Sequence, residues 1–200
     1  GVGWASVAWG DYDNDGDLDI LLTGAAASGN IAEVYRNEGA GVFTDISAGL
    51  PGTYHATASS WGDYDNDGDL DILGNSADGA ICIHRNDSSG VFTQVPLPYW
   101  EDAAKVWGDY DNDGDLDIIA TSSVCENTEW GFLSRALGLP SVYASGSSIA
   151  CGDYDQDRDL DVLIAGNASS DPADRIAKVF RSDGAPANWW PAAPENLSAS

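Results

Sequence analysis

Short apolar runs separated by turn-forming residues make up most of this 200-residue chain. Runs such as Ile20-Leu21-Leu22 and Ile118-Ile119 contain two or three apolar residues and soon give way to Gly, Asn, Asp or Pro. Such short runs, bounded by turn residues, predict β-strands. No segment sustains the roughly 3.6-residue period of an amphipathic helix, so we expect little helix and an all-β fold.

One acidic segment recurs four times and divides the chain into similar units. The string W-G-D-Y-D-N-D-G-D-L-D-I occupies residues 9–20, 61–72 and 107–118, and a degraded copy, C-G-D-Y-D-Q-D-R-D-L-D-V, occupies residues 151–162. Successive copies begin 52, 46 and 44 residues apart. Each interval offers about four strand-like runs, which matches one blade of a β-propeller.

Small residues precede the acidic segments, as in Ala5-Ser6-Val7-Ala8, and suit strands crowded around a propeller axis. A tandem stack of hairpins would explain the period but not this preference. We therefore expect a β-propeller of about four four-stranded blades, either a four-bladed ring or an arc of a larger propeller. The expected blades are residues 1–50, 51–97, 98–139 and 140–183.

Charge excludes several classes of function. The chain has 33 Asp and Glu against 8 Lys and Arg, a formal net charge of −25, so it is not a nucleic-acid binder that neutralises phosphates. No apolar run approaches the roughly 20 residues of a membrane span, so we expect no membrane insertion. The chain has no Met, as expected of a processed or excised piece, so a missing signal peptide does not argue against secretion.

The acidic segments carry the most specific chemistry. We number the nine residues of each D-x-D-x-D-x-D-x-D loop from 1 to 9, and name residues 11–19, 63–71, 109–117 and 153–161 the first to fourth loops. Carboxylates at positions 1, 3 and 5 lie on one side of a tight turn and suit Ca²⁺, which takes about six to eight oxygen ligands. Gly at position 6 permits the positive φ of such a turn. The carbonyl at position 7 and the Asp at position 9 would complete the shell.

Other readings of the loop fit less well. An EF-hand would need a Glu at position 12 and flanking helices, and neither is present. Magnesium prefers a tighter octahedron with retained water, and zinc would need nearby His or Cys. Carboxylate-pair catalysis needs two carboxylates in different environments, whereas every unit repeats the same set. We therefore expect no enzyme activity.

The loops, followed by Y-R-N-x-G-x-G-V-F-T, resemble the FG-GAP or VCBS repeats of integrin-type β-propellers over residues 1–183. That resemblance implies a Ca²⁺ in the hairpin that joins the first two strands of each blade. The implied ligands are the side chains at positions 1, 3, 5 and 9 and the carbonyl at position 7. Loop by loop, the residues at these five positions are Asp11, Asp13, Asp15, Asp17 and Asp19; Asp63, Asp65, Asp67, Asp69 and Asp71; Asp109, Asp111, Asp113, Asp115 and Asp117; and Asp153, Asp155, Asp157, Asp159 and Asp161.

The chain departs from the family pattern in two ways. The fourth loop has Arg158 at position 6, where a non-Gly residue costs on the order of 1 kcal/mol and its cation would lie beside the metal. We therefore expect three strong calcium sites and a fourth, weaker one. Integrin-type propellers are seven-bladed, whereas this chain has material for about four blades. Residues 184–200 are expected to form a linker, and their closing A-P-E-N-L-S-A-S resembles the start of a fibronectin type III domain.

Several residues outside the loops also carry expectations. The Trp that begins three repeats should pack between blades, and the arginines at 36, 85, 135 and 181 are expected in register, balancing nearby Asp. Cys125 and Cys151 could form a disulfide in an oxidising compartment, which the sequence leaves open. Asn86, Asn167 and Asn196 begin glycosylation sequons. The Trp residues outside the repeat are candidates for a surface that stacks on sugar or contacts protein: Trp4, Trp100, Trp130, Trp189 and Trp190.

These observations favour a calcium-binding structural or adhesive module of a secreted or cell-surface protein. The expected partner is another protein, or further copies of the chain assembling into a fibre through open sheet edges. An outer strand is due after Arg181, where Pro186 and Pro191 appear instead, so we expect an open edge there. The alternatives are a lectin-like module that binds glycan and the non-catalytic propeller of a larger secreted enzyme.

Overall fold

The computed structural model describes residues 1–52, 59–88, 90–98, 104–137, 139, 142, 147–167, 175–182 and 195–196. These residues form four antiparallel sheets of four strands each, and none of them lies in a helix. The all-β fold of four four-stranded propeller blades, predicted from the repeat, is therefore confirmed. No helix with the length and apolarity of a membrane span occurs in the described part of the chain.

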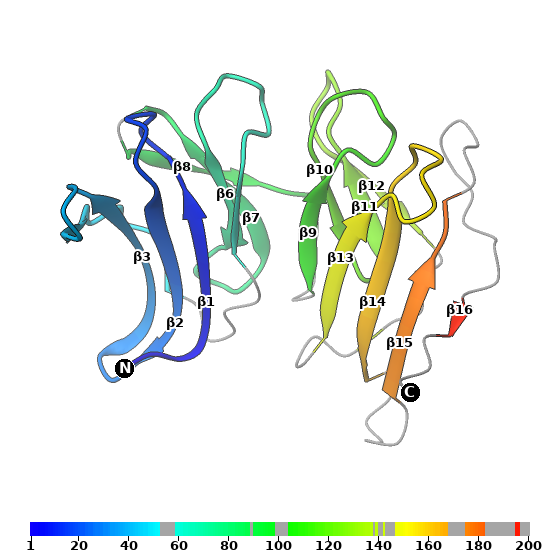
Figure 1. Cartoon of the computed structure of the whole chain (residues 1–200), viewed down its shortest axis with the longest axis horizontal. Helices are drawn as coiled ribbons and strands as arrows, with labels where there is room; N and C mark the ends of the chain where they lie inside the picture. The colour runs from blue at the N-terminus through cyan, green and yellow to red at the C-terminus, as the bar shows by residue number, and fades with distance from the viewer. Residues whose placement is uncertain are drawn as a thin grey trace. The chain divides into compact units, whose positions relative to one another are not determined.

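The strands of each sheet follow one another in chain order (Figure 1). The first sheet contains β1 (Gly3–Gly10), β2 (Asp19–Ala26), β3 (Gly29–Asn37) and β4 (Phe43–Asp45). The second contains β5 (Ser60–Gly62), β6 (Asp71–Asn75), β7 (Ile81–Asn86) and β8 (Phe92–Pro96). The third contains β9 (Lys105–Gly108), β10 (Asp117–Ala120), β11 (Ser123–Glu126) and β12 (Leu133–Ala136). The fourth contains β13 (Ser148–Gly152), β14 (Asp161–Asn167), β15 (Arg175–Phe180) and β16 (Glu195–Asn196).

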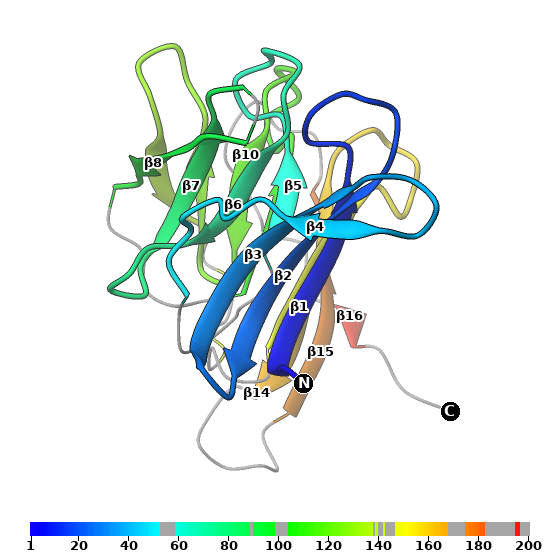
Figure 2. The ribbon, with the colours of Figure 1, turned by 90° about the vertical axis from the view of Figure 1, so that its left-hand side faces the viewer.

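The chain divides into two compact units, Gly1–Asp102 and Ala103–Ser200, so that each unit holds two sheets. Figure 2 shows the long strands β1, β2 and β3 of the first unit running side by side. The apolar runs that follow the acidic loops become β2, β6, β10 and β14, the second strand of each sheet. Each of these second strands contributes buried apolar side chains, such as Leu21, Ile72 and Val162. The two central strands of the second sheet, β6 and β7, are buried along almost their whole length.

Each unit has its own apolar core. In the first unit, Tyr12, Leu21, Val34 and Ile72 pack together, and the ring of Tyr12 stacks on Trp61 with centroids 6.1 Å apart. In the second unit the core residues are Ile119, Val124, Leu137, Leu139, Val162, Ile164 and Phe180. Tyr12 belongs to an acidic loop, so the core of the first unit also anchors that loop.

The Trp of the repeat packs between two sheets at Trp61, as predicted. A Cβ added to Gly10 would lie 2.6 Å from the indole of Trp61, so the sheets of the first unit pack closely at this point. In the second unit Cys151 takes the same place, and a Cβ added to Gly108 would lie 3.8 Å from its Cβ. Trp9 instead is 61% exposed and tilts against Phe43 of its own sheet. The inter-blade interpretation therefore stays a prediction for Trp9.

The end of the chain departs from the expected open edge. Glu195 and Asn196 form β16 and pair with Val179 and Lys178 of β15, which completes the fourth sheet. A strand needs only extended backbone with free N–H and C=O groups, and residues 184–200 have no alternating pattern that would reveal it. The prolines at 186 and 191 and the rest of the expected linker lie outside the described residues.

Candidate metal centre

All four acidic loops occupy the same place in the fold. Each loop joins the first strand of its sheet to the second, with position 9 as the first residue of that second strand. The loops extend beyond the ends of these strands, as the first and third sheets show in Figure 1. The repeated sequence therefore forms the same hairpin loop in all four sheets.

The Asp at position 1 organises each turn. One of its oxygens accepts the backbone N–H of position 5 and the other accepts the N–H of position 6, at distances of 3.0 to 3.1 Å. The Asp at position 5 in turn accepts the N–H of position 7. Such side-chain-to-backbone bonds are typical of Asx turns. The pattern is the same in all four loops, including the fourth.

The Asp at position 9 ties the loop to the sheet. This residue is almost completely buried in every loop, with an exposed fraction of 0 to 2%. One oxygen accepts the N–H of the residue at position 2, and the other accepts the N–H of a residue at the end of the third strand or just after it. Each carboxylate oxygen has two lone pairs, so this role leaves acceptor capacity for a metal.

Two loop positions have a left-handed backbone. Position 6 has φ between 93° and 96° where it is Gly, and Arg158 takes up φ 80° at the same position. A Cβ added to the loop glycines would meet nothing within 4 Å, so Gly is favoured there for its conformation and not for space. Position 4 also has positive φ, between 57° and 65°, in all four loops. The Asn that stands there in three loops is well suited to this region, a signal that the sequence analysis missed.

The turn brings carboxylates of each loop together. In the first loop, oxygens of Asp11, Asp13 and Asp15 lie within 4.8 Å of one another. In the other loops the corresponding groups come from positions 1, 3 and 9: Asp63, Asp65 and Asp71; Asp109, Asp111 and Asp117; Asp153, Asp155 and Asp161. Position 9 of the first loop and position 5 of the others lie outside these groups. The side chain of position 7 belongs to none of these groups, and its carbonyl role stays a prediction.

Burial leaves some of these carboxylates poorly compensated. One oxygen each of Asp13 and Asp155 is buried without a hydrogen-bond partner. Burial, followed by repulsion from the position 5 carboxylate, raises the pKa of Asp13, Asp65 and Asp111 above its ordinary value. Burial also raises the pKa of Asp71 and of Asp117 to about 7, against the opposing effect of their backbone hydrogen bonds. Closely spaced oxygens with unused acceptor capacity fit a hard cation such as Ca²⁺.

The prediction that the four arginines lie in register holds for three of them and is wrong for Arg135. Arg36, Arg85 and Arg181 all stand just before the residue whose N–H binds position 9. Arg135 does not, because it lies in the fourth strand of its sheet and pairs with Glu126 at 2.7 Å. Glu126 is the residue in register with the other arginines, since Asn127 after it donates to Asp117.

Adjacent loops within each unit are joined by Asn side chains, which the sequence analysis did not foresee. In the first unit Asn14, at position 4, donates to the carboxylate of Asp69 at 2.9 Å and to the carbonyl of Gly68. In the second unit Asn112 donates likewise to Asp159 at 3.2 Å. Position 4 of one loop thus holds position 7 of the next. The repeat alone could have pointed to this pairing, because Asn and Asp recur at these positions.

Asn86 provides a second, buried link in the first unit. Its side-chain amide donates to the carbonyl of Tyr12 in the first loop at 2.9 Å, and its backbone N–H donates to Asp71 in the second. The residue is only 1% exposed. Its side chain is therefore not accessible for attachment of a glycan in the folded chain, and that sequon is a chance match.

Other candidate residues lie apart from the loops. Trp4 and Trp130 are exposed, by 74% and 93%, in different units. Trp100, Trp189 and Trp190 lie outside the described residues, as do Ala168 and Ser169 of the second sequon. Cys125 and Cys151 form no disulfide with each other.

A protein built of four-stranded antiparallel blades, with an Asp-rich loop in the first hairpin of each, belongs to the class of Asp-loop β-propellers. Comparison with known families narrows this class. The profile of the FG-GAP-like repeat matches residues 24–74 and 63–120. Residues 24–120 therefore carry FG-GAP-like repeats, as the resemblance implied. The matched segments contain the second and third loops.

Among solved structures, the chain is similar to the biofilm matrix protein Bap1 of V. cholerae, with 17% sequence identity and a TM-score of 0.47. The similarity covers 90% of this chain and 37% of Bap1, so the chain spans just over a third of that protein's length. No curated protein matches the chain significantly in sequence.

Proposed function

We propose that this chain is a calcium-binding structural or adhesive propeller module of a secreted or cell-surface protein. The observation that carries the proposal is the clustering of three carboxylates in each of the four loops. In the first and fourth loops, one carboxylate oxygen of the cluster is also buried without a hydrogen-bond partner. In the proposed sites, Ca²⁺ is held by the Asp side chains at positions 1, 3, 5 and 9 and by the carbonyl at position 7. When bound, Ca²⁺ supplies positive charge that offsets the repulsion among these carboxylates.

The chemistry of the loop also favours a structural role for the metal. Every ligand proposed is an oxygen, which suits Ca²⁺ better than zinc. In the first loop, position 1 already accepts a backbone N–H of the turn, and position 9 accepts one from the end of β3. A cation between these positions would therefore fasten the hairpin to the sheet. Because the same arrangement recurs in every sheet, we infer that the metal stiffens the whole repeat region instead of serving one reaction centre.

The decisive experiment compares melting temperatures in chelator, Ca²⁺ and Mg²⁺. A ligand that binds only the folded state stabilises it by about 2.7 kcal/mol per site at a hundredfold excess over its Kd. We expect the melting temperature to fall sharply in chelator and to recover more fully with Ca²⁺ than with Mg²⁺. An unchanged melting temperature in chelator would exclude calcium as a structural ligand.

A matched pair of variants localises the effect. Asp111→Asn removes a charge at position 3 of the third loop, whereas Glu129→Gln removes one from the exposed turn between β11 and β12. We expect Asp111→Asn to reduce the stabilisation by Ca²⁺ and Glu129→Gln to preserve it. Equal responses of the two variants would mean that Ca²⁺ acts through net charge and not through the loop.

The adhesive part of the proposal needs its own test, since sheet edges are the usual route to β-assembly. The outer strands β4, β8, β12 and β16 are all short, with two to five residues each. We expect Ca²⁺-loaded chains to associate with one another or with a protein partner through these edges. Light scattering over a concentration series in millimolar Ca²⁺ measures self-association. A monodisperse monomer at every concentration would rule out the fibre.

A further inference from the structure

The fourth loop has a cation against it that is supplied by the protein itself. In the first and second sheets, Arg36 and Arg85 place their Nε atoms 2.9 and 2.8 Å from the carboxylates of Glu38 and Asp87, outside the loops. Arg181, at the corresponding position of the fourth sheet, instead lies against the loop. Its Nε is 2.8 Å from Asp155 Oδ2 and its Nη2 is 3.6 Å from Asp157 Oδ2.

These two carboxylates stand at positions 3 and 5, which are both proposed calcium ligands. Asp155 also belongs to the cluster with Asp153 and Asp161, so the guanidinium contacts the edge of the proposed site. The other oxygen of Asp155 stays buried without a hydrogen-bond partner, so Arg181 satisfies the cluster only in part. The side chains of Asp155 and Asp157 are 20% and 29% exposed, which limits screening of this interaction by solvent.

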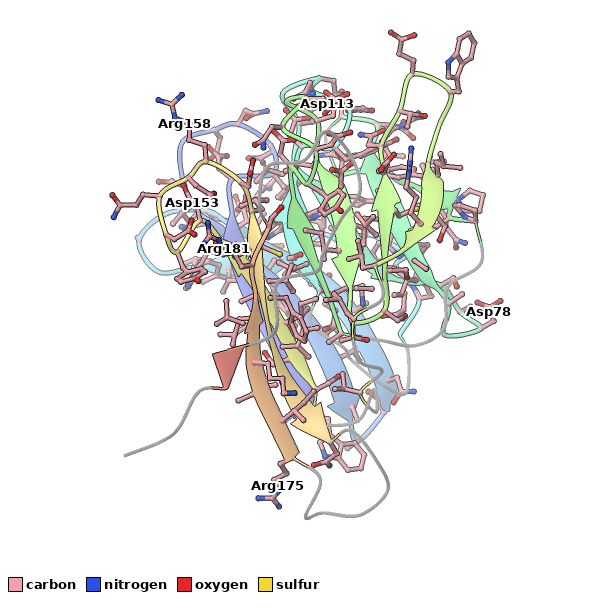
Figure 3. All side chains as sticks on the ribbon, turned by 90° about the vertical axis from the view of Figure 1, so that its right-hand side faces the viewer. Asp78, Asp113, Asp153, Arg158, Arg175 and Arg181 are labelled. Atoms are coloured by element: carbon pink, nitrogen blue, oxygen red, sulfur yellow. The ribbon has the colours of Figure 1, made fainter. Side chains whose placement is uncertain are left out.

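The second arginine of this region does not share that role. Figure 3 shows the side chain of Arg158 pointing away from the loop, whereas Arg181 lies below the loop on the side of the strands. The expectation that the cation of Arg158 would lie beside the metal is therefore wrong. The positive charge against the ligands comes from outside the loop sequence, after β15.

We propose that Arg181 is a tethered competitor of Ca²⁺ at the fourth loop, an inference that rests on the calcium-binding function proposed above. A guanidinium and Ca²⁺ repel each other, so the metal can use Asp155 and Asp157 fully only when Arg181 has moved away. Because Arg181 is attached to the same sheet, its local concentration is constant and high. The ion pair thus holds the fourth loop folded without metal and lowers its affinity for Ca²⁺.

The consequence is a graded response to calcium. In the first and second sheets the corresponding arginines form their ion pairs outside the loops, with Glu38 and Asp87, and act on Asp13 and Asp65 only as a lesser electrostatic influence. At low Ca²⁺ the fourth loop keeps its structure through Arg181, while loops that lack the contact depend on the metal. At high Ca²⁺ the fourth loop fills last.

The test is a Ca²⁺ titration of the full chain, followed through backbone amide resonances. The N–H groups of Arg158 and Ser182 bind Asp153 and Asp161 and so report on the fourth loop. Those of Gly114 and Asn127 report on the third loop in the same way. Loss of a partly exposed ion pair changes an equilibrium constant by up to about fivefold. We therefore expect Arg181→Gln to raise the calcium affinity of the fourth loop by about that factor and to leave the third loop unchanged.

Arg85→Gln is the matched control, because it removes an arginine at the same position whose partner, Asp87, lies outside the loop. It should not raise the affinity of the fourth loop, because Arg85 acts on Asp65 and Tyr64 of the second loop. In chelator, Arg181→Gln should speed hydrogen exchange at the N–H of Arg158, whereas Arg85→Gln should not. Unchanged or lower affinity of the fourth loop in Arg181→Gln would overturn the proposal.

Failure of the two proposals can be told apart. If no loop of the parent chain responds to Ca²⁺, the calcium function fails, and with it the competition. If the third loop binds Ca²⁺ and the fourth is indifferent to Arg181→Gln, only the competition fails. Should Arg181→Gln not fold without metal, Arg181→Lys replaces it, since an ammonium keeps the charge but loses the planar fork. Because the ammonium still repels Ca²⁺, its fourth loop is then expected to bind Ca²⁺ more weakly than the third loop, and a fourth loop that binds more tightly than the third would overturn the proposal.

Discussion

Position 6 of the loops shows how a single residue can depart from the repeat without changing the turn. Arg158 keeps the left-handed backbone and donates its N–H to Asp153, as the glycines of the other loops donate to position 1. A side chain in this region of φ costs on the order of 1 kcal/mol. Because the space around position 6 is open, that cost is conformational and not steric. The substitution at position 6 therefore strains the backbone of the fourth loop but does not change its turn.

Replacing Arg158 with Gly should release this strain. We expect Arg158→Gly to raise the free energy of unfolding by about 1 kcal/mol, with or without Ca²⁺, because Gly adopts positive φ freely. Denaturant unfolding in chelator and in Ca²⁺ measures the change. The reciprocal variant Gly114→Arg should lower the free energy of unfolding by a similar amount. A large rise in calcium affinity in Arg158→Gly, without a change in metal-free stability, would show that charge and not backbone conformation governs this position.

At the scale of strands and loops, the sequence predicts what repeats and fails where partners lie far apart in the chain. The four loops, the strands around them and the blade architecture follow from one string of residues that recurs in register. The pairing of Arg135 with Glu126 does not follow, because a short hairpin in the third sheet moves the arginine from the third strand to the fourth. Nor does Arg181 at the fourth loop, since the contact joins residues more than twenty positions apart. Such contacts depend on the register of pairing, which composition does not encode.

The link between adjacent loops in the first unit should be energetically coupled. Asn14→Gly removes the donor while keeping the positive φ of position 4, and Asp69→Ala removes the acceptor. A hydrogen bond to a charged group at the surface predicts a coupling energy of about 0.5–1.5 kcal/mol in a double-mutant cycle measured in Ca²⁺. Pairing Asn14→Gly with Asp87→Asn, which share no partner, should give additive effects. Additivity in the Asn14 and Asp69 cycle would mean that the loops are independent.

On the scale of the whole chain, electrostatic repulsion is the main cost that the fold must meet. The net charge of −25 is concentrated, since most of the acidic residues fall in four nine-residue loops. The described residues give these loops few compensating cations, of which Arg181 is one. Packing within each unit, such as the stack of Tyr12 on Trp61, must then hold carboxylates close together against their repulsion. Bound calcium and dissolved salt should relieve the same repulsion by different routes.

The dependence of stability on salt should therefore differ between the metal-free and the calcium-bound protein. In chelator, raising NaCl from about 0.01 to 0.3 M shortens the screening length from roughly 30 Å to below 10 Å and weakens repulsion between exposed charges. We expect the melting temperature to rise steeply over this range. In saturating Ca²⁺ each ion offsets part of the negative charge of its loop, so the same series should give a shallower response. Scanning calorimetry of both series measures the two slopes, with Glu129→Gln as a control that removes one negative charge without changing a loop. Equal slopes in chelator and in Ca²⁺ would show that the loops do not carry the repulsion, because neutralising them would then leave the salt response unchanged.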